Sequence, residues 1–235
     1  MNLWTTATAA DEAGRQAEAA VLPIGSFEQH GSHLPLTTDT IVASAIAAAV
    51  ADHYDLFLLP PVTISCSHEH SGWAGTVSIS ARTLDAIVTD IVDSLRHSGI
   101  RHVVLVNGHG GNYVLSNIVQ QANVTRPQLA LFPTRADWEV ARSDAGLAST
   151  THDDMHAGEI ETSVLLHVAP DTVRDGYQQS DHIAERPHLL TLGMRAYTPT
   201  GVLGRPSLAS ADKGRKVLGS LTASFKSTLE MLTGR

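Results

Sequence analysis

The sequence is poor in cysteine, in charged residues and in basic segments. Cys66 is the only cysteine among 235 residues, which excludes a disulfide framework and a zinc site built from thiolates. Charged residues make up 17% of the chain and the formal net charge is −8, so nucleic acids and anionic membranes are unsuitable partners. The longest apolar run, residues 41–51, is too short to span a bilayer, and residues 1–15 lack a signal-peptide pattern. We therefore expect a soluble, cytoplasmic protein that binds neither nucleic acid nor membrane.

Aromatic residues are also scarce, with only 4 Phe, whereas histidine occurs 13 times. Hydrophobic residues make up 43% of the chain, which is enough to build a full core. The length predicts a single α/β domain over residues 1–235 rather than two domains. Several histidines lie in tight clusters, and these clusters direct the search for function.

Short apolar segments alternate with segments of helical periodicity. We predict strands at residues 20–25, 56–60, 102–106 and 129–132, helices at 38–53, 83–97, 112–125, 159–168 and 211–232, and a loop at 191–205. This alternation predicts βαβ units, and therefore a mainly parallel sheet with helices on both faces. Sites in such sheets lie at the carboxyl ends of the strands, where the histidine clusters fall.

The first cluster follows the first predicted strand. Glu28 and His30 are two residues apart, so in an extended segment their side chains point the same way. Asp39 opens the following helix and can face the same pocket. A carboxylate with an imidazole suits a divalent ion such as Zn, Mn or Fe(II). Taken alone, Asp39 is better explained as a helix N-cap and Glu28 as a solvated loop residue.

The second cluster is Asn-Gly-His-Gly-Gly-Asn at residues 107–112, directly after the third strand. It lacks the Gly-Lys-Ser/Thr ending of a P-loop, and Tyr113 occupies the place of the third glycine of a dinucleotide fingerprint. The glycines instead leave room around His109, so that it can point into a crowded site. The alternative is a structural turn that carries an incidental histidine.

The third cluster covers residues 153–163. In a continuous helix His156 and Glu159 share one face, whereas Glu161 points elsewhere unless the turn at residues 157–158 is irregular. Acidic residues near a helix N-terminus can be explained by the helix dipole alone, but a histidine there is poorly explained.

A fourth segment, Ser-His-Glu-His-Ser-Gly at residues 67–72, can supply ligands through His68 or His70, or form a substrate-facing loop. An ordinary polar surface loop is the alternative. Neither a Gly-x-Ser-x-Gly elbow nor a His-Glu-x-x-His motif occurs, which disfavours a serine hydrolase and the usual zinc protease.

Three of these segments, at residues 25–35, 107–112 and 156–163, together resemble the creatininase (creatinine amidohydrolase) family in content, order and spacing. The similarity runs from about Val21 to about Lys216. It implies a three-layer α/β/α sandwich with a mainly parallel sheet, a hydrolase with two divalent metal ions per chain, and assembly as a homohexamer.

The resemblance also implies roles for individual residues. Asp39 resembles the bridging carboxylate, Glu28 and His109 the partners on one metal, and His30 a ligand of the other. His156 resembles the catalytic proton carrier, and Glu161 matches a family acid close to the site.

Creatininase itself has a glutamate ligand two residues after the strand-end histidine, where this chain has Gly111. Our hypothesis is that Glu159 supplies the missing metal ligand. We assign substrate binding to His70, Trp73 and Trp138, because no complete aromatic lid of the creatininase kind is evident.

The predicted function is hydrolysis of an amide, cyclic amide or formamide C–N bond of a small molecule by metal-activated water. Family branches that remove formamide groups from pyrimidine precursors, or trim a peptide in mycofactocin maturation, are alternatives. Residues 201–204 resemble the peptidase branch, whereas Glu159 departs from its pattern. The remaining alternatives are a lactonase, a non-catalytic metal- or ligand-binding protein and a nucleotide-binding module, the last disfavoured by the failed glycine patterns.

Overall fold

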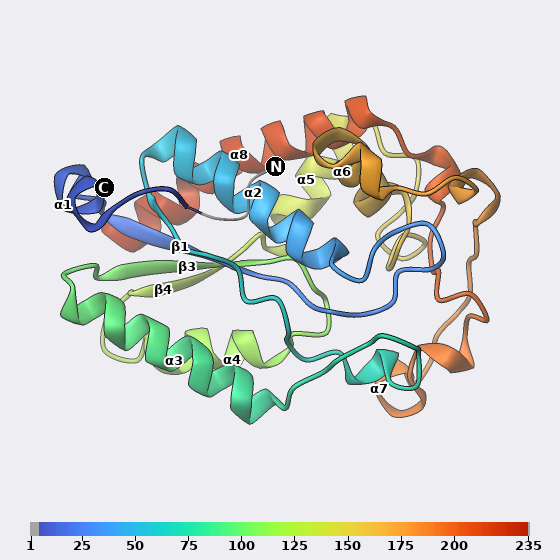
Figure 1. Cartoon of the computed structure of the whole chain (residues 1–235), viewed down its shortest axis with the longest axis horizontal. Helices are drawn as coiled ribbons and strands as arrows, with labels where there is room; N and C mark the ends of the chain where they lie inside the picture. The colour runs from blue at the N-terminus through green and yellow to red at the C-terminus, as the bar shows by residue number, and fades with distance from the viewer. Residues whose placement is uncertain (1–4, 235) are drawn as a thin grey trace.

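A parallel sheet of four strands forms the centre of the computed structural model, which describes residues 5–234 (Figure 1). The strands are β1 (Ala19–Ile24), β2 (Phe57–Leu58), β3 (His102–Asn107) and β4 (Leu129–Phe132). Their order is β2-β1-β3-β4, and every neighbouring pair is parallel. Ile24 pairs with Asn107, so the segments that leave β1 and β3 start side by side.

Four helices cover one face of the sheet: α2 (Thr38–Tyr54), α5 (Arg135–Ala145), α6 (Glu159–Val168) and α8 (Ala211–Thr233) (Figure 1). α2 is apolar or small on nearly every side, because it lies between the sheet and α6 and α8. The core on this face includes Val21, Ile46, Phe132 and Phe225, all buried.

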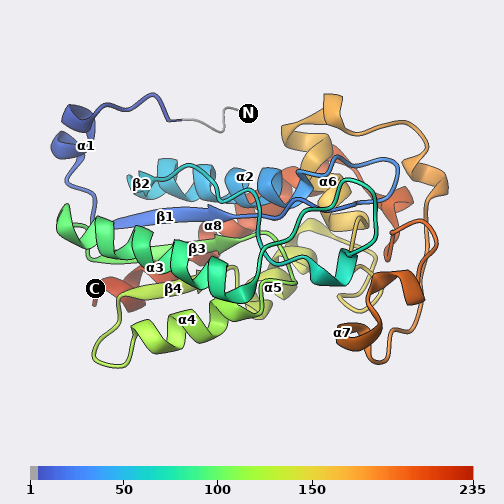
Figure 2. The same ribbon diagram turned by 60° about the horizontal axis from the view of Figure 1, so that its bottom comes forward.

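The opposite face carries α3 (Ala81–His97) and α4 (Val114–Ala122) (Figure 2). α3 buries one stripe of residues, Leu84, Val88, Val92 and Leu95, at the spacing of an amphipathic helix. Helices on both faces of a parallel sheet confirm the predicted three-layer α/β/α architecture.

The remaining elements are short: α1 (Ala9–Arg15), α7 (Leu189–Leu192), and the 3-10 turns η1 (His68–His70), η2 (Pro170–Thr172), η3 (Tyr177–Gln179), η4 (Met194–Ala196) and η5 (Pro206–Leu208). Several predicted bounds were wrong. The strand expected at 56–60 keeps only two residues, and the helix expected at 112–125 spans only Val114–Ala122. The expected loop at 191–205 contains the end of α7 and the whole of η4. Within the described residues, no helix is both long enough and apolar enough to cross a membrane.

Helix α5 was not predicted from the sequence. The helix begins with a capping box, in which the Thr134 hydroxyl accepts from the Asp137 amide and the Asp137 carboxylate accepts from the Thr134 amide. It buries only Ala141, Arg142 and Ala145, so its apolar stripe is narrow. The missed helix matters because it lines the cavity beside the histidine clusters.

Candidate metal centre and active site

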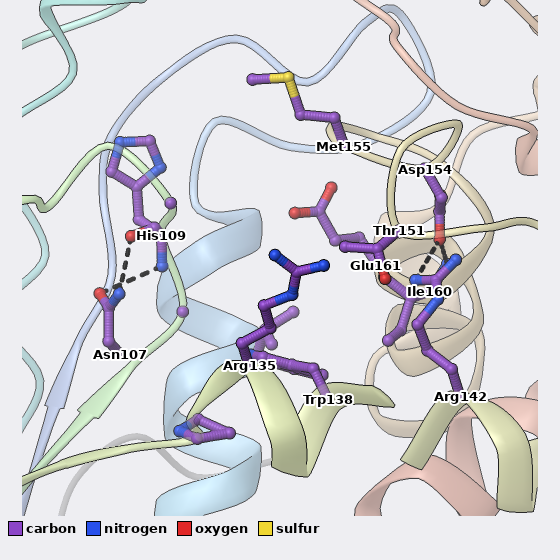
Figure 3. Close-up of a pocket in the computed structure, with 14 residues that line it drawn as sticks. Asn107, His109, Arg135, Trp138, Arg142, Thr151, Asp154, Met155, Ile160 and Glu161 are labelled. Carbon is purple, nitrogen blue, oxygen red and sulfur yellow. Dashed lines mark hydrogen bonds and ion pairs between the residues drawn. The ribbon is translucent and has the colours of Figure 1, made fainter. Parts of the chain in front are cut away.

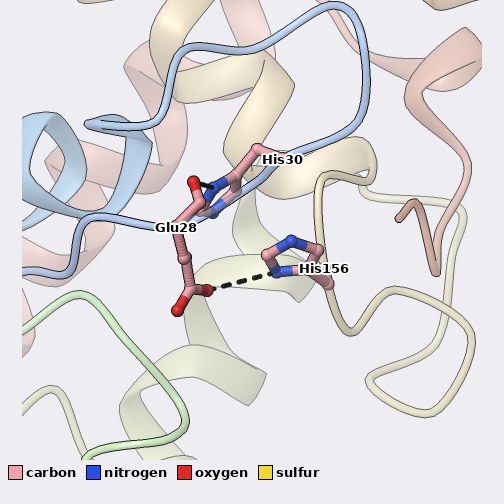
Figure 4. Close-up of side chains that lie close together, drawn as sticks. All are labelled: Glu28, His30 and His156. Carbon is pink, nitrogen blue, oxygen red and sulfur yellow. Dashed lines mark hydrogen bonds and ion pairs between the residues drawn. The ribbon is translucent and has the colours of Figure 1, made fainter. Parts of the chain in front are cut away.

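The segment after β1 turns two chemically active side chains into the protein interior. Glu28 and His30 are both fully buried, although Glu28 taken alone was expected to be a solvated loop residue. The Nδ1–H of His30 donates to the Glu28 carbonyl at 3.1 Å, which turns the Nε2 lone pair of His30 away from the backbone. Figure 4 shows both side chains converging with His156 from a different part of the chain.

Asp39 lies in the first turn of α2, but its side chain does not cap the helix. Its Oδ1 is 3.1 Å from His30 Nε2, and its Oδ2 is 3.0 Å from His109 Nδ1. The Ser26 hydroxyl donates to Oδ2 at 2.7 Å and fixes the carboxylate. One carboxylate therefore faces two imidazoles, one through each oxygen.

His109 lies directly beyond the end of β3. Its Nε2–H donates to the Cys66 carbonyl at 2.9 Å, so its Nδ1 lone pair faces Glu28 Oε1 at 3.2 Å and Asp39 Oδ2 at 3.0 Å. A Cβ at Gly108 would collide with the Asp39 carbonyl oxygen. Glycine at position 108 is therefore what lets the turn approach α2 and bring His109 to Asp39.

The third cluster is not a continuous helix. His156 forms an isolated antiparallel β-bridge with Leu203, so its backbone is extended. Ala157 has a φ of 53°, and α6 begins only at Glu159. This irregular turn brings Glu161 back toward the site, where its Oε2 accepts from the Ala157 amide and lies 4.0 Å from His30 Nε2. Glu161, rather than Glu159, thus joins the cluster.

The structure does not bring Glu159 to the other predicted ligands. Its carboxylate accepts from Lys213 Nζ at 2.5 Å and from the amides of Ala148 and Ser149. These contacts lower the pKa of Glu159 in spite of its burial. Both carboxylate oxygens already accept hydrogen bonds and do not face the other predicted ligands. The hypothesis that Glu159 replaces a ligand at Gly111 assumed an uninterrupted helix, and the turn at residues 157–158 removes that assumption.

The described residues contain three sets of side chains whose potential ligand atoms lie within 4.8 Å of one another: Glu28, Asp39 and His109; His30, Asp39 and Glu161; Glu28, His30 and His156. The first two sets share Asp39. Neither carboxylate oxygen of Glu28 has a hydrogen-bond partner among the described residues. Buried carboxylate oxygens and imidazole lone pairs are all electron-rich, so they repel one another unless a cation or a proton lies between them. The arrangement of these residues therefore fits divalent ions.

The electrostatics of the cluster lead to the same conclusion. Burial, together with the charge of Asp39, raises the pKa of Glu28 to about 7 and that of Glu161 to about 8. Burial opposes the charged form of His30, but Asp39 outweighs it and raises the pKa of His30 to about 9. Without cations the cluster therefore retains protons near neutral pH, and those protons occupy the places of missing positive charge.

His156 and His70 form a neutral pair beside the carboxylates. His156 Nε2–H donates to the Gln29 carbonyl at 2.7 Å, which leaves Nδ1 facing Glu28 Oε1 at 3.8 Å (Figure 4). The Gln29 amide nitrogen lies 3.0 Å from His70 Nδ1, and His70 Nε2 lies 3.1 Å from Glu28 Oε1. Burial and the neighbouring histidines hold the pKa of His156 well below its usual value.

Two cavities open onto the cluster. One, of about 480 Å³, is lined by residues that include Arg135, Trp138 and Thr151. The other, of about 290 Å³, is lined by residues that include Glu69, Tyr113 and Arg186. They share His109, Gly110, Met155 and Glu161. In Figure 3 the Arg135 guanidinium extends into the space between His109 and Glu161.

The three residues predicted to bind substrate have different surroundings. His70 is buried inside the cluster, and Trp138 lines the larger cavity. Trp73 lines neither cavity, and its ring instead lies 4.7 Å from the Arg195 guanidinium carbon. The structure therefore separates Trp73 from the other two.

Three residues at the site were not found from the sequence. Gln29 contacts both neutral histidines, Glu69 lies 3.3 Å from His109 Nε2, and Arg142 pairs with Asp154 in the wall of the larger cavity. Gln29 and Glu69 lie next to residues that had been selected, so proximity was a usable signal. Nothing in the sequence pointed to Arg142, because α5 was missed.

The creatininase family model, described as creatinine amidohydrolase, matches residues 4–229. The chain belongs to the creatininase family. This confirms the predicted family, and with it the predicted class of enzyme, a metal-dependent hydrolase.

Individual relatives cover most of the chain. The mycofactocin precursor peptide peptidase of Mycobacterium ulcerans (strain Agy99) is 37% identical over 214 residues, which cover 86% of this chain and 80% of the relative. Creatinine amidohydrolase of Pseudomonas putida is 28% identical over 219 residues, with coverages of 84% and 83%. The solved structure named "Creatininase Mn" matches with a TM-score of 0.80 and 22% identity over 96% of each chain, which shows the common fold.

Proposed function

We propose that this creatininase-family protein hydrolyses a C–N bond with two divalent cations. Glu28, Asp39 and His109 would hold one cation, and His30, Asp39 and Glu161 the other, with Asp39 shared. The observation that carries the proposal is the arrangement around Asp39, whose two oxygens each face an imidazole that is tied to a backbone carbonyl through its far nitrogen. This ligand set accepts Zn, Mn or Fe(II).

When bound, the cations would supply a lowered pKa for water and a Lewis acid for the substrate carbonyl. The protein supplies the rest. Its buried carboxylates balance the cationic charge, and the two His–carbonyl hydrogen bonds favour the tautomers whose nitrogen lone pairs face the cation sites. The low solvent exposure of the cluster strengthens each electrostatic interaction there.

His156 is proposed to carry a proton from the nucleophile to the leaving nitrogen. Its Nε2–H is held by the Gln29 carbonyl, so the free acceptor is Nδ1, which faces the cluster. Because its pKa is depressed, the ring is neutral at pH 7 and its Nδ1 lone pair is free. The His70 ring packs against the His156 ring, with 4.5 Å between the ring centroids.

The favoured substrate is a short peptide rather than a compact cyclic amide. Cavities of about 480 and 290 Å³ extend from the cluster and share four of their lining residues, so a chain can occupy both sides of the scissile bond. The relative with 37% identity is named as a peptidase, whereas the relative named as a creatinine amidohydrolase has 28% identity. A small amide is the second candidate, and it rests on that second relative.

The test is a panel of unblocked and end-blocked peptides, cyclic amides and formamides, incubated with Zn- or Mn-loaded protein and analysed by mass spectrometry. We expect cleavage of peptides, abolished in the matched variant Asp39→Asn, which lacks the shared carboxylate. Cleavage of cyclic amides alone would favour the second candidate. Cleavage that survives both Asp39→Asn and chelation would overturn the proposed centre.

A further inference from the structure

A carboxylate that the proposed reaction does not use lies directly behind His109. Glu69 belongs to the 3-10 turn η1, and its Oε1 is 3.3 Å from His109 Nε2. Its side chain is only 14% exposed. Nε2 is the ring nitrogen that points away from Glu28 and Asp39, so Glu69 contacts the far edge of this ligand histidine.

Gly111 determines whether Glu69 can occupy this position. A Cβ built on Gly111 would collide with Glu69 Oε1 and with His109 Nε2, and would lie 2.9 Å from Glu69 Cδ. These contacts are closer than real Cβ atoms show, so a side chain at position 111 and the present position of Glu69 exclude each other. The absence of a side chain at Gly111 therefore allows the Glu69 carboxylate to lie beside His109.

The segment that carries Glu69 is fixed to the turn that carries Gly111. The Asn112 side chain accepts from the Cys66 amide at 3.2 Å and donates to the Gly25 carbonyl at 3.3 Å and to Asn107 Oδ1 at 3.0 Å. On the other side, the backbone of Gly193 lies against the Glu69 carbonyl, which would be 3.1 Å from a Cβ at position 193. Glu69 is thus held from two sides rather than resting on an open surface.

A carboxylate at the far nitrogen of a metal-binding histidine has a known physical effect. It favours the tautomer whose N–H points toward the carboxylate, and it increases the basicity of the opposite nitrogen. Here the Cys66 carbonyl already accepts that N–H at 2.9 Å, and Glu69 adds a negative charge at the same ring edge. The ring separates Glu69 from Glu28 and Asp39, so Glu69 acts through His109.

We propose that Glu69 is a positioning residue that fixes the tautomer and orientation of His109, and that Gly111 leaves the space that the Glu69 carboxylate occupies. The inference rests on the proposed metal centre. Since Glu69 contacts the ligand and not the reacting atoms, its removal should change metal affinity more than it changes the stability of the metal-free protein.

The first experiment measures Zn²⁺ affinity by competition with a chromophoric chelator, together with the melting temperature of the metal-free protein. We expect Glu69→Ala to weaken binding of one ion by about 10- to 100-fold, and Glu69→Gln to weaken it less, because an amide oxygen still accepts. His68→Ala is in the same turn, but its side chain is exposed and lies 3.4 Å from the Ser78 hydroxyl, so this variant should bind metal as the wild type does. In the metal-free variants, ¹⁵N NMR should show a loss of the single His109 tautomer.

The second experiment is a double-mutant cycle with Gly111→Ala. Because the new methyl group displaces Glu69, Gly111→Ala should weaken metal binding in the wild-type background by a similar factor. In the Glu69→Ala background it should cost less, because the larger of the two clashes is gone. Equal effects of Gly111→Ala in both backgrounds would overturn the proposed exclusion.

The outcomes separate this inference from the function on which it rests. If the wild type binds metal and both Glu69 variants bind it equally well, the positioning role is wrong and the metal centre stands. If the wild type binds no metal, both proposals are wrong. A fall in melting temperature with unchanged metal affinity would assign Glu69 to stability alone and would also overturn the inference.

Discussion

Two glutamates on one helix have different chemical surroundings, although they are two residues apart. Glu161 faces His30 and Asp39, whereas Glu159 is paired with Lys213 and with backbone amides. We therefore expect Glu161→Gln to lower the metal content by about one ion per chain without a large loss of stability. Elemental analysis of the dialysed protein measures this change.

Glu159→Gln is the matched control, and it should lower stability without lowering the metal content. It removes the anionic partner of the partly buried Lys213 and puts a neutral amide at the fully buried position 159, so the free energy of unfolding should fall by about 2 kcal/mol, measured by urea denaturation. The metal content should not change. A loss of metal from Glu159→Gln and not from Glu161→Gln would restore the hypothesis drawn from the sequence.

His156 is expected to affect turnover more than metal binding. His156→Ala should lower kcat by about 10²- to 10⁴-fold, because the proton carrier is lost while Glu28, Asp39 and His109 remain in place. Steady-state kinetics and metal analysis on the same preparation measure both quantities. A parallel loss of metal would instead assign His156 to the ligand set that it forms with Glu28 and His30.

At the residue scale, motifs predicted most of the cluster because its residues are close in sequence to strand ends. Glu28, His30 and His109 follow β1 and β3, whose ends are paired in the sheet. Glu159 was chosen on the assumption of helical spacing through Ala157, whose positive φ no local sequence pattern predicts. Glu69 lies next to His68 and His70 in the sequence, but its contact with His109, which is distant in sequence, forms only in the folded chain.

At the scale of elements, the first turn of α6 is stabilised by a buried ion pair between Asp154, which precedes the helix, and Arg142 of α5. Asp154 accepts from the amides of Glu159 and Ile160 and pairs with Arg142 of α5 at 2.9 Å, so it satisfies the first turn of α6 from outside. The helix that carries Glu161 is therefore positioned by α5.

We expect Asp154→Asn to lower the free energy of unfolding by about 2 kcal/mol and also to reduce kcat, because the first turn of α6 carries Glu161. Thermal and urea denaturation, with kinetics, measure the two effects. Asp153→Asn is the control, because the Asp153 carboxylate has no hydrogen-bond or ion-pair partner among the described residues, and it should change stability by less than about 0.5 kcal/mol. Equal effects of the two variants would contradict this account.

The central elements could be predicted because their periodicities are strong. β4 and α6 have the predicted bounds, and α3 shows a clear apolar stripe. α5 was missed because its stripe is narrow and its capping signal is short. β2 is shorter than the strand expected at 56–60, because only two of its residues pair with β1. Strand pairing depends on the tertiary structure, and an apolar run does not reveal it.

At the scale of the whole molecule, metal binding should be coupled to pH. Burial raises the pKa of Glu28 to about 7 and that of Glu161 to about 8, while Asp39, against the effect of burial, raises that of His30 to about 9. Each group must lose its proton before it can bind a cation, so protons compete with metal at low pH.

Affinity should therefore rise between pH 6 and pH 8, by about tenfold or more per pH unit if at least one proton is released per ion. Calorimetry in buffers of different ionisation enthalpy measures the number of protons released. Affinity that is independent of pH over this range would contradict the cluster described here. The homohexamer and the single domain stay predictions, which sedimentation and limited proteolysis address.

The most direct test of the central claim is the metal content per chain of protein purified without chelator, measured by elemental analysis together with peptide cleavage before and after chelation. The account predicts about two transition-metal ions per chain, removed together with activity by a chelator and restored together by Zn or Mn. Protein that takes up no such ion, even when Zn or Mn is added, would contradict the metal centre built around Asp39.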